Sequence, residues 1–274
     1  MKPFARRRLR SLAIAFLVVV GLGYWLQWID QGLGRRSYMS GYVLYGLVAF
    51  LAAFNVRKKL PTLPLGNAST WLQLHIYVGL VTAGLFVMHI GWRLPNGWFE
   101  CMLATSFSMT TVSGILGLIM TRRTPQMLNR VRDQVVYERV PILRRALAVR
   151  SREMVMQSVA DSGATTLADF YAGRLFDFFA RPRPFGYYLK PSSTRRKRLL
   201  YDMKQLDRYL SVPERDACEQ LFAMVREKDD LDFQEMQQRW VKLWLFLHIA
   251  LTYVLIVLAT LHGVLALSHR GDVL

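Results

Sequence analysis

Cysteine is scarce in this sequence, and the motifs that depend on it are missing. Cys101 and Cys218 are the only cysteines in 274 residues, so we expect neither a disulfide framework nor a zinc site of paired cysteines. A glycine-rich dinucleotide fingerprint is also missing, which argues against a nicotinamide- or flavin-binding fold in this sequence. Chemistry that depends on such motifs is therefore not expected here.

Charged side chains are missing from five long apolar stretches, apart from Lys242 near the start of the last one. Hydrophobic residues make up 53% of the chain and gather in these stretches. The stretches lie at about 11–29, 38–56, 70–92, 101–120 and 240–268. Each has close to the ~20 residues that a helix needs to cross the hydrocarbon core of a bilayer. The sequence therefore predicts an all-α membrane protein with five transmembrane helices.

Acidic residues are too few to balance the basic ones, and the net charge is +17. Such a charge can indicate nucleic-acid binding, but Lys and Arg lie beside the ends of the apolar stretches, so no nucleic-acid partner is expected. Residues 1–10 hold five of them, and segment 121–239 holds 23 against 16 Asp and Glu. The positive-inside rule predicts a multi-pass protein of the bacterial inner membrane, with a cytoplasmic N-terminus and an outer C-terminus. No A-x-A-like cleavage site follows the first stretch, so it is expected to stay as a span rather than act as a signal peptide.

The polar segment between the fourth and fifth stretches divides the chain into three parts. We expect transmembrane helices one to four in 1–120, a cytoplasmic helical insert in 121–239, and transmembrane helix five with a short outer tail in 240–274. Within the insert, Ser211 and Glu214 have the spacing of a capping box, which predicts the start of a helix. This helix is expected to continue directly into the fifth span.

Histidine is also rare, and four of the five histidines form two pairs with one spacing. His75 and His89 lie fourteen positions apart in the third stretch, and His248 and His262 lie fourteen apart in the fifth. On an α-helix this spacing is about 40° short of four full turns and rises about 21 Å, so each pair occupies one helix face at two depths. The third and fifth spans are expected to run in the same direction. His75 would then face His248, and His89 would face His262.

Two opposed imidazoles provide the axial nitrogens of a six-coordinate haem, whose porphyrin supplies the other four. The four paired histidines are therefore predicted to be metal ligands of two haems, and no catalytic residue is assigned. Small residues on neighbouring helices would leave room for the porphyrin. We assign this role to Gly114 and Gly117, with Gly41, Gly46 and Ser113 as further candidates. Because no C-x-x-C-H motif occurs, the haems would be non-covalent and of b type.

The H-x13-H spacing on two parallel spans resembles that of di-haem membrane cytochromes b. With histidines on the third and fifth spans, the chain is similar to the transmembrane domain of ferric reductases and NADPH oxidases, and to the cytochrome b core of bc complexes. The segments TTVSGILGLIMTRRTPQML (110–128) and QVVYERVP (134–141) further resemble bacterial cytochrome b-like proteins with an insert before the last span. The resemblance covers spans two to five, and it implies that His75, His89, His248 and His262 ligate haem.

These features predict an electron-transfer component of an oxidoreductase complex, which passes electrons across the membrane between redox partners. The expected partners are membrane lipid and redox proteins such as c-type cytochromes or iron–sulfur proteins, and a quinone is a further candidate. One alternative is a cytochrome b subunit of a quinol oxidoreductase. Another, from a different class, is a redox-inactive membrane anchor whose histidines relay protons.

Overall fold

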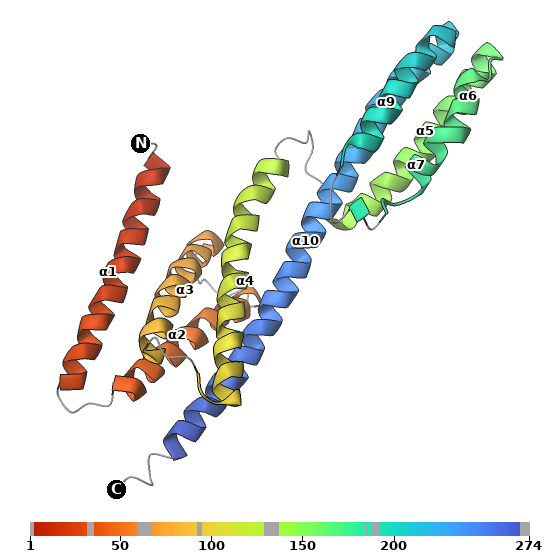
Figure 1. Cartoon of the computed structure of the whole chain (residues 1–274). Helices are drawn as coiled ribbons and strands as arrows, with labels where there is room; N and C mark the ends of the chain where they lie inside the picture. The colour runs from red at the N-terminus through yellow and green to blue at the C-terminus, as the bar shows by residue number, and fades with distance from the viewer. Residues whose placement is uncertain are drawn as a thin grey trace. The chain divides into compact units, whose positions relative to one another are not determined.

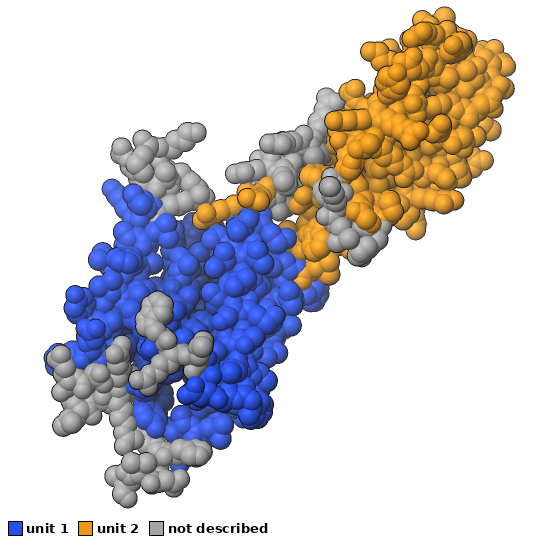
Figure 2. Space-filling model, viewed as in Figure 1, with its two compact units in different colours: residues 1–120, 244–274 blue, residues 121–243 orange. Residues whose placement is uncertain are grey.

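The computed structural model describes residues 3–31, 36–59, 67–91, 95–128, 137–184, 186–187 and 192–268. These residues form helices and connecting turns, and no β-strand occurs among them. The prediction of an all-helical chain is therefore confirmed for this part of the protein. The chain divides into two compact units (Figure 2). Unit 1 comprises residues 1–120 and 244–274, and unit 2 comprises residues 121–243.

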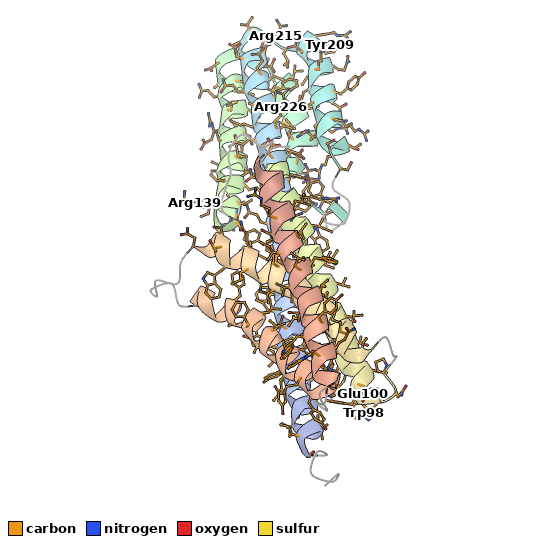
Figure 3. The ribbon with its side chains drawn as sticks, turned by 90° about the vertical axis from the view of Figure 1, so that its left-hand side faces the viewer. Trp98, Glu100, Arg139, Tyr209, Arg215 and Arg226 are labelled. Atoms are coloured by element: carbon orange, nitrogen blue, oxygen red, sulfur yellow. The ribbon has the colours of Figure 1, made fainter. Side chains whose placement is uncertain are left out.

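Unit 1 is built from five long helices (Figure 1). They are α1 (Pro3–Gln31), α2 (Arg36–Lys59), α3 (Ala68–Ile90), most of α4 (Trp98–Leu128) and the second part of α10 (Val212–Ser268). Each helix is long and apolar enough to cross a membrane, as the sequence predicted. Helices α3 and α10 run in the same direction and α4 runs opposite to them, so α4 starts, at Trp98 and Glu100, at the end of unit 1 where α10 finishes (Figures 1 and 3).

The outside of unit 1 is apolar. On α1, Ile14, Phe16 and Leu17 are 62%, 68% and 66% exposed, and Val112 on α4 and Val257 on α10 are exposed to a similar degree. In water, so large an apolar surface would favour aggregation. In lipid the same surface meets hydrocarbon, and the helices pair their own backbone polar groups. Unit 1 therefore has the surface expected of a membrane domain.

Helix α10 contributes to both units because it runs unbroken from Val212 to Ser268. Its 57 residues correspond to about 85 Å, which is far more than the ~30 Å hydrocarbon thickness of a bilayer. We therefore treat residues 244–268, which belong to unit 1, as the membrane-spanning part. The predicted continuation of the insert's last helix into the fifth span is observed in this helix.

Unit 2 is a small helical unit with its own apolar core. Its elements are η1 (Tyr137–Arg139), α5 (Val140–Ser162), α6 (Thr166–Phe170), the π-helical turn η2 (Tyr171–Leu175), α7 (Phe176–Ala180), α9 (Thr194–Leu206), η3 (Asp207–Tyr209) and the first part of α10. Leu167, Leu175, Phe178, Met203 and Leu221 are completely buried in this core. The core draws on α6, η2, α7, α9 and α10, so these elements fold around one centre.

Glu214 joins the starts of α6 and α10. Its carboxylate accepts hydrogen bonds from the backbone N–H and the hydroxyl of Ser211, each at 3.0 Å, and from the backbone N–H of Leu167 at 2.9 Å. Burial alone would raise the pKa of Glu214, but these hydrogen bonds together lower that pKa below its ordinary value. Glu214 thus forms its half of the predicted capping box and also satisfies an N–H in the first turn of α6. The Ser211 hydroxyl donates to the carboxylate instead of accepting from the helix.

A buried ion cluster ties the loop after α7 to α10. Arg183 Nε donates to Asp232 Oδ2 at 2.8 Å, and the Arg183 guanidinium also pairs with Asp229. Lys228 Nζ donates to the same Asp232 oxygen at 2.6 Å, and Arg144 lies 3.2 Å from the other oxygen. Arg183, Lys228, Asp229 and Asp232 are each at most 6% exposed. Asp232 therefore contacts three cations within unit 2, and Asp229 and Glu235 pair with two of the same cations.

Candidate functional site

His75 on α3 and His248 on α10 lie opposite one another inside unit 1. Their ring centroids are 6.4 Å apart, and their ring planes make an angle of 78°. Both side chains are half-buried. The phenyl ring of Phe54, on α2, lies against His75 with a centroid distance of 5.1 Å. The structure thus brings together the two histidines that the sequence places at similar depth on parallel helices.

His248 is held by two residues of its neighbourhood. Its Nδ1 atom lies 3.2 Å from the hydroxyl oxygen of Ser113 on α4. The indole of Trp244, one turn earlier on α10, stacks on the His248 ring with a centroid distance of 5.6 Å and an interplanar angle of 23°. Trp244 Nε1 also donates a 2.8 Å hydrogen bond to the carbonyl oxygen of Ser113. Position and orientation of the imidazole are therefore set from both α4 and α10.

The two glycines of α4 that the sequence analysis assigns to the site lie beside these residues. A Cβ atom at Gly114 would lie 3.6 Å from Cε1 of His248, which is ordinary contact with the edge of the ring. A Cβ atom at Gly117 would lie 1.8 Å from the Trp244 indole, so only glycine allows the indole to reach the Ser113 carbonyl. Gly114 thus borders the histidine, and Gly117 borders the tryptophan that stacks on it.

His89 on α3 and His262 on α10 line one cavity of about 300 Å³ at the other end of the two helices. Its remaining walls come from α2, α3, α4 and α10 and are mostly apolar, with Gly41, Tyr38 and Thr260 among the lining residues. His89 Nδ1 lies 2.8 Å from the hydroxyl oxygen of Ser40 on α2. The ring of Phe99 stacks on His262 with a centroid distance of 6.4 Å. The second predicted pair therefore borders a space large enough for a ligand.

A cluster of packed apolar side chains forms one part of the wall of this cavity. Val48, Phe107 and Leu255, from α2, α4 and α10, are each at most 6% exposed and pack together. Phe86 of α3 stacks on Phe107 with ring centroids 4.0 Å apart. Leu255 lies midway along α10 between His248 and His262, so the packed layer belongs to the middle of the span.

Ser40 and Trp244 are among the residues of the site that were not assigned from the sequence. Ser40 is 1% exposed, and its hydroxyl is hydrogen-bonded to His89 on α3. Trp244 lies four positions before His248 and stacks on its ring. A signal for Ser40 exists in the sequence, because Ser40–Gly41 and Ser113–Gly114 are the same dipeptide in the second and fourth spans. Gly46, a further candidate for porphyrin contact, has no neighbour within 4 Å of a Cβ built on it.

Each histidine pair could hold a metal only together with a ligand that brings donor atoms of its own. Each pair offers two imidazoles, and the described part of the chain has no group of three or more His, Cys, Asp or Glu side chains that could hold a metal ion. A metal held by two protein ligands needs its remaining coordination positions filled by another group. A macrocycle with four equatorial nitrogens does this.

Comparison of the chain with protein-family models, with curated proteins and with solved structures gives no match.

Proposed function

We propose that the protein is a membrane electron-transfer subunit that holds two non-covalent b-type haems between α3 and α10. His75 and His248 would be the axial ligands of one haem, and His89 and His262 those of the other. Haem with both axial positions occupied supplies reversible one-electron transfer and has no open position for oxygen. The proteins that deliver and accept the electrons would be separate redox proteins, such as c-type cytochromes or iron–sulfur proteins, or a quinone.

The observation that carries this proposal is the distance between the His75 and His248 rings. A metal–imidazole bond of about 2.0 Å and a ring radius of about 1.2 Å place the centroids of two trans imidazoles about 6.3 Å apart. The centroids of His75 and His248 are 6.4 Å apart. This spacing supports a site that is already arranged for one metal ion between the two rings.

The surroundings of the histidines support the same proposal. Gly41 and Gly114 border the rings of His89 and His248, where a larger side chain would narrow the space beside the ring edge. Val48, Phe107 and Leu255 form an apolar part of the wall of the cavity that His89 and His262 line. In surroundings of low polarity, less solvent has to reorganise when an electron is transferred. Each nearby hydrogen bond also has a larger effect on the reduction potential.

For orientation, we propose that the N-terminus and unit 2 lie in the cytoplasm of a bacterial cell and that the C-terminus lies outside the inner membrane. The support is the distribution of Lys and Arg, which favours the side of residues 1–10 and of segment 121–239. The His75–His248 pair would then lie toward the cytoplasm, and the His89–His262 pair toward the outside. Electrons would be exchanged at both faces of the membrane.

The two cysteines give a direct test of this orientation. Cys101 is exposed in the first turn of α4, whereas Cys218 is buried in unit 2. Burial of the Cys218 thiol and, to a smaller extent, the negative charges of Asp207 and Glu219 raise its pKa to about 11. Maleimides react with the thiolate, so Cys218 is expected to react roughly two orders of magnitude more slowly than an ordinary thiol. A membrane-impermeant maleimide added to spheroplasts should therefore label the wild-type chain and fail to label Cys101→Ala. Labelling that requires an opened membrane would reverse the proposed orientation.

Electron transfer across the membrane is tested in liposomes that contain a reductant inside and ferricyanide outside. The wild-type protein is expected to reduce external ferricyanide. His89→Ala should reduce the rate by at least about tenfold, because it removes an axial ligand of the haem nearest the outer face. Ser106→Ala, at a buried serine of α4 outside both histidine pairs, serves as the matched control. Equal rates for wild type and His89→Ala would contradict the proposed path.

A further inference from the structure

Two Ser-Gly dipeptides make the same pair of contacts with two different histidines. On α2, Ser40 Oγ lies 2.8 Å from His89 Nδ1, and a Cβ atom at Gly41 would lie 3.3 Å from His89 Cε1. On α4, Ser113 Oγ lies 3.2 Å from His248 Nδ1, and a Cβ atom at Gly114 would lie 3.6 Å from His248 Cε1. In both places the serine hydroxyl lies within hydrogen-bond distance of the histidine Nδ1 atom, and the glycine that follows it leaves room for the edge of the imidazole ring.

The two contacts fall on one histidine of each pair. His89 and His248 belong to different pairs and to different helices, and each meets a serine from a third helix. The other members of the pairs lie against aromatic rings, His75 against Phe54 and His262 against Phe99. A serine hydroxyl therefore lies within hydrogen-bond distance of a histidine ring at each of the two depths.

The direction of the hydrogen bond at Ser40 follows from its second partner. The Ser40 hydroxyl donates to the carbonyl oxygen of Ser37 at 3.1 Å. Because a hydroxyl has a single hydrogen, its oxygen is left to accept from the Nδ1–H of His89. With its hydrogen on the Ser37 carbonyl, the hydroxyl pairs with the Nδ1–H tautomer of His89, whose Nε2 lone pair is the one that binds a metal.

A hydrogen bond at Nδ1 also changes the ligand. A metal-bound histidine that donates its other N–H is fixed in tautomer and ring orientation and becomes a more basic ligand. A more basic axial ligand stabilises the oxidised iron and lowers the reduction potential. At Ser40 the contact is shorter than at Ser113, and its hydroxyl is already polarised by its own donation to Ser37, which strengthens it as an acceptor.

We propose that Ser40 and Ser113 are positioning residues, each of which holds one axial histidine through Nδ1 and lowers the reduction potential of the haem bound by that histidine. The inference rests on the proposed function, because it requires His89 and His248 to be axial ligands. Ser40 acts on the His89–His262 haem and Ser113 on the His75–His248 haem. The effect of Ser40 is the larger of the two.

The test is a redox titration of the purified full-length protein, followed by the haem absorption bands. The two haems are first assigned with His248→Ala and His262→Ala, each of which leaves one haem. Ser40→Ala is expected to raise the midpoint potential of the His89–His262 haem only. Ser113→Ala is expected to raise that of the His75–His248 haem only, and by less. Ser40→Thr and Ser113→Thr, which keep the hydroxyl, should restore the wild-type potentials, and Ser106→Ala should leave both unchanged.

The outcomes separate this inference from the function on which it rests. Loss of a single haem from an Ala variant, with retention in the Thr variant, also supports positioning by the hydroxyl. Two bound haems whose potentials do not respond to Ser40→Ala or Ser113→Ala would overturn the serine assignment and leave the proposed function intact. A wild-type protein without haem would overturn both.

Discussion

His75→Ala and His248→Ala are expected to remove one and the same haem, so that each purified variant retains about half of the wild-type haem content. The physical reason is that the centroids of the two rings lie 6.4 Å apart, so that in the proposed function both rings would hold the same metal. A metal that loses one axial ligand in a membrane interior loses much of its binding energy, because the alanine offers no donor atom. Haem content per chain and the absorption spectrum of the reduced protein measure the effect.

The controls use the other histidines. His89→Ala and His262→Ala should remove the second haem and leave the first, so the spectra of the four variants should fall into two classes. His269→Ala, at the remaining histidine, should keep both haems; this residue lies outside the described part of the structure. If His75→Ala and His248→Ala depleted different haems, the pairing of α3 with α10 would be wrong.

Asp232→Ala is expected to destabilise unit 2 by about 3–5 kcal/mol. Asp232 is 1% exposed and contacts Arg183, Lys228 and Arg144. Its removal takes away the carboxylate that Lys228 contacts at 2.6 Å, whereas Arg183 still pairs with Asp229 and Arg144 with Glu235. The loop that contains Arg183 would also lose one of the two ion pairs that join Arg183 to α10. Limited proteolysis of the full-length protein should show faster cleavage within residues 137–243, with the haem content of unit 1 maintained.

Asp177→Ala provides the matched control for this variant. Asp177 pairs with Arg181 in the same unit, but their side chains are 56% and 74% exposed. Exposed ion pairs contribute less than about 1 kcal/mol, so this variant should be cleaved at the wild-type rate. Equal proteolysis of Asp232→Ala and Asp177→Ala would show that the buried ion cluster does not stabilise unit 2.

The helices and the facing histidines could be predicted because their signals repeat at fixed intervals. Apolar stretches of about twenty residues identify spans regardless of their neighbours. Two equal fourteen-residue spacings place His75 opposite His248 once their helices run in parallel. The continuity of α10 was also predictable, because the segment before the fifth span contains good helix formers and no glycine or proline after Pro213 until Gly263.

The contacts between helices could not be predicted in the same way. Whether the Ser40 hydroxyl meets His89 depends on the rotation of α2 about its own axis, which apolar spacing alone does not fix. Gly117 was expected to border a porphyrin, and its immediate neighbour is the Trp244 indole, which reaches it from a residue 127 positions away. The buried ion cluster joins Arg183 to Asp232 across 49 positions, and the charge pattern of either segment gives no sign of its partner.

The most direct test of the central claim is the haem content of the purified wild-type protein. A pyridine haemochrome spectrum should be of b type and should correspond to two haems per chain. The reduced spectrum should be low-spin and unchanged by carbon monoxide, because both axial positions of each iron would be occupied by histidine. A stably folded protein that contains no haem would contradict the account and would favour a redox-inactive membrane protein.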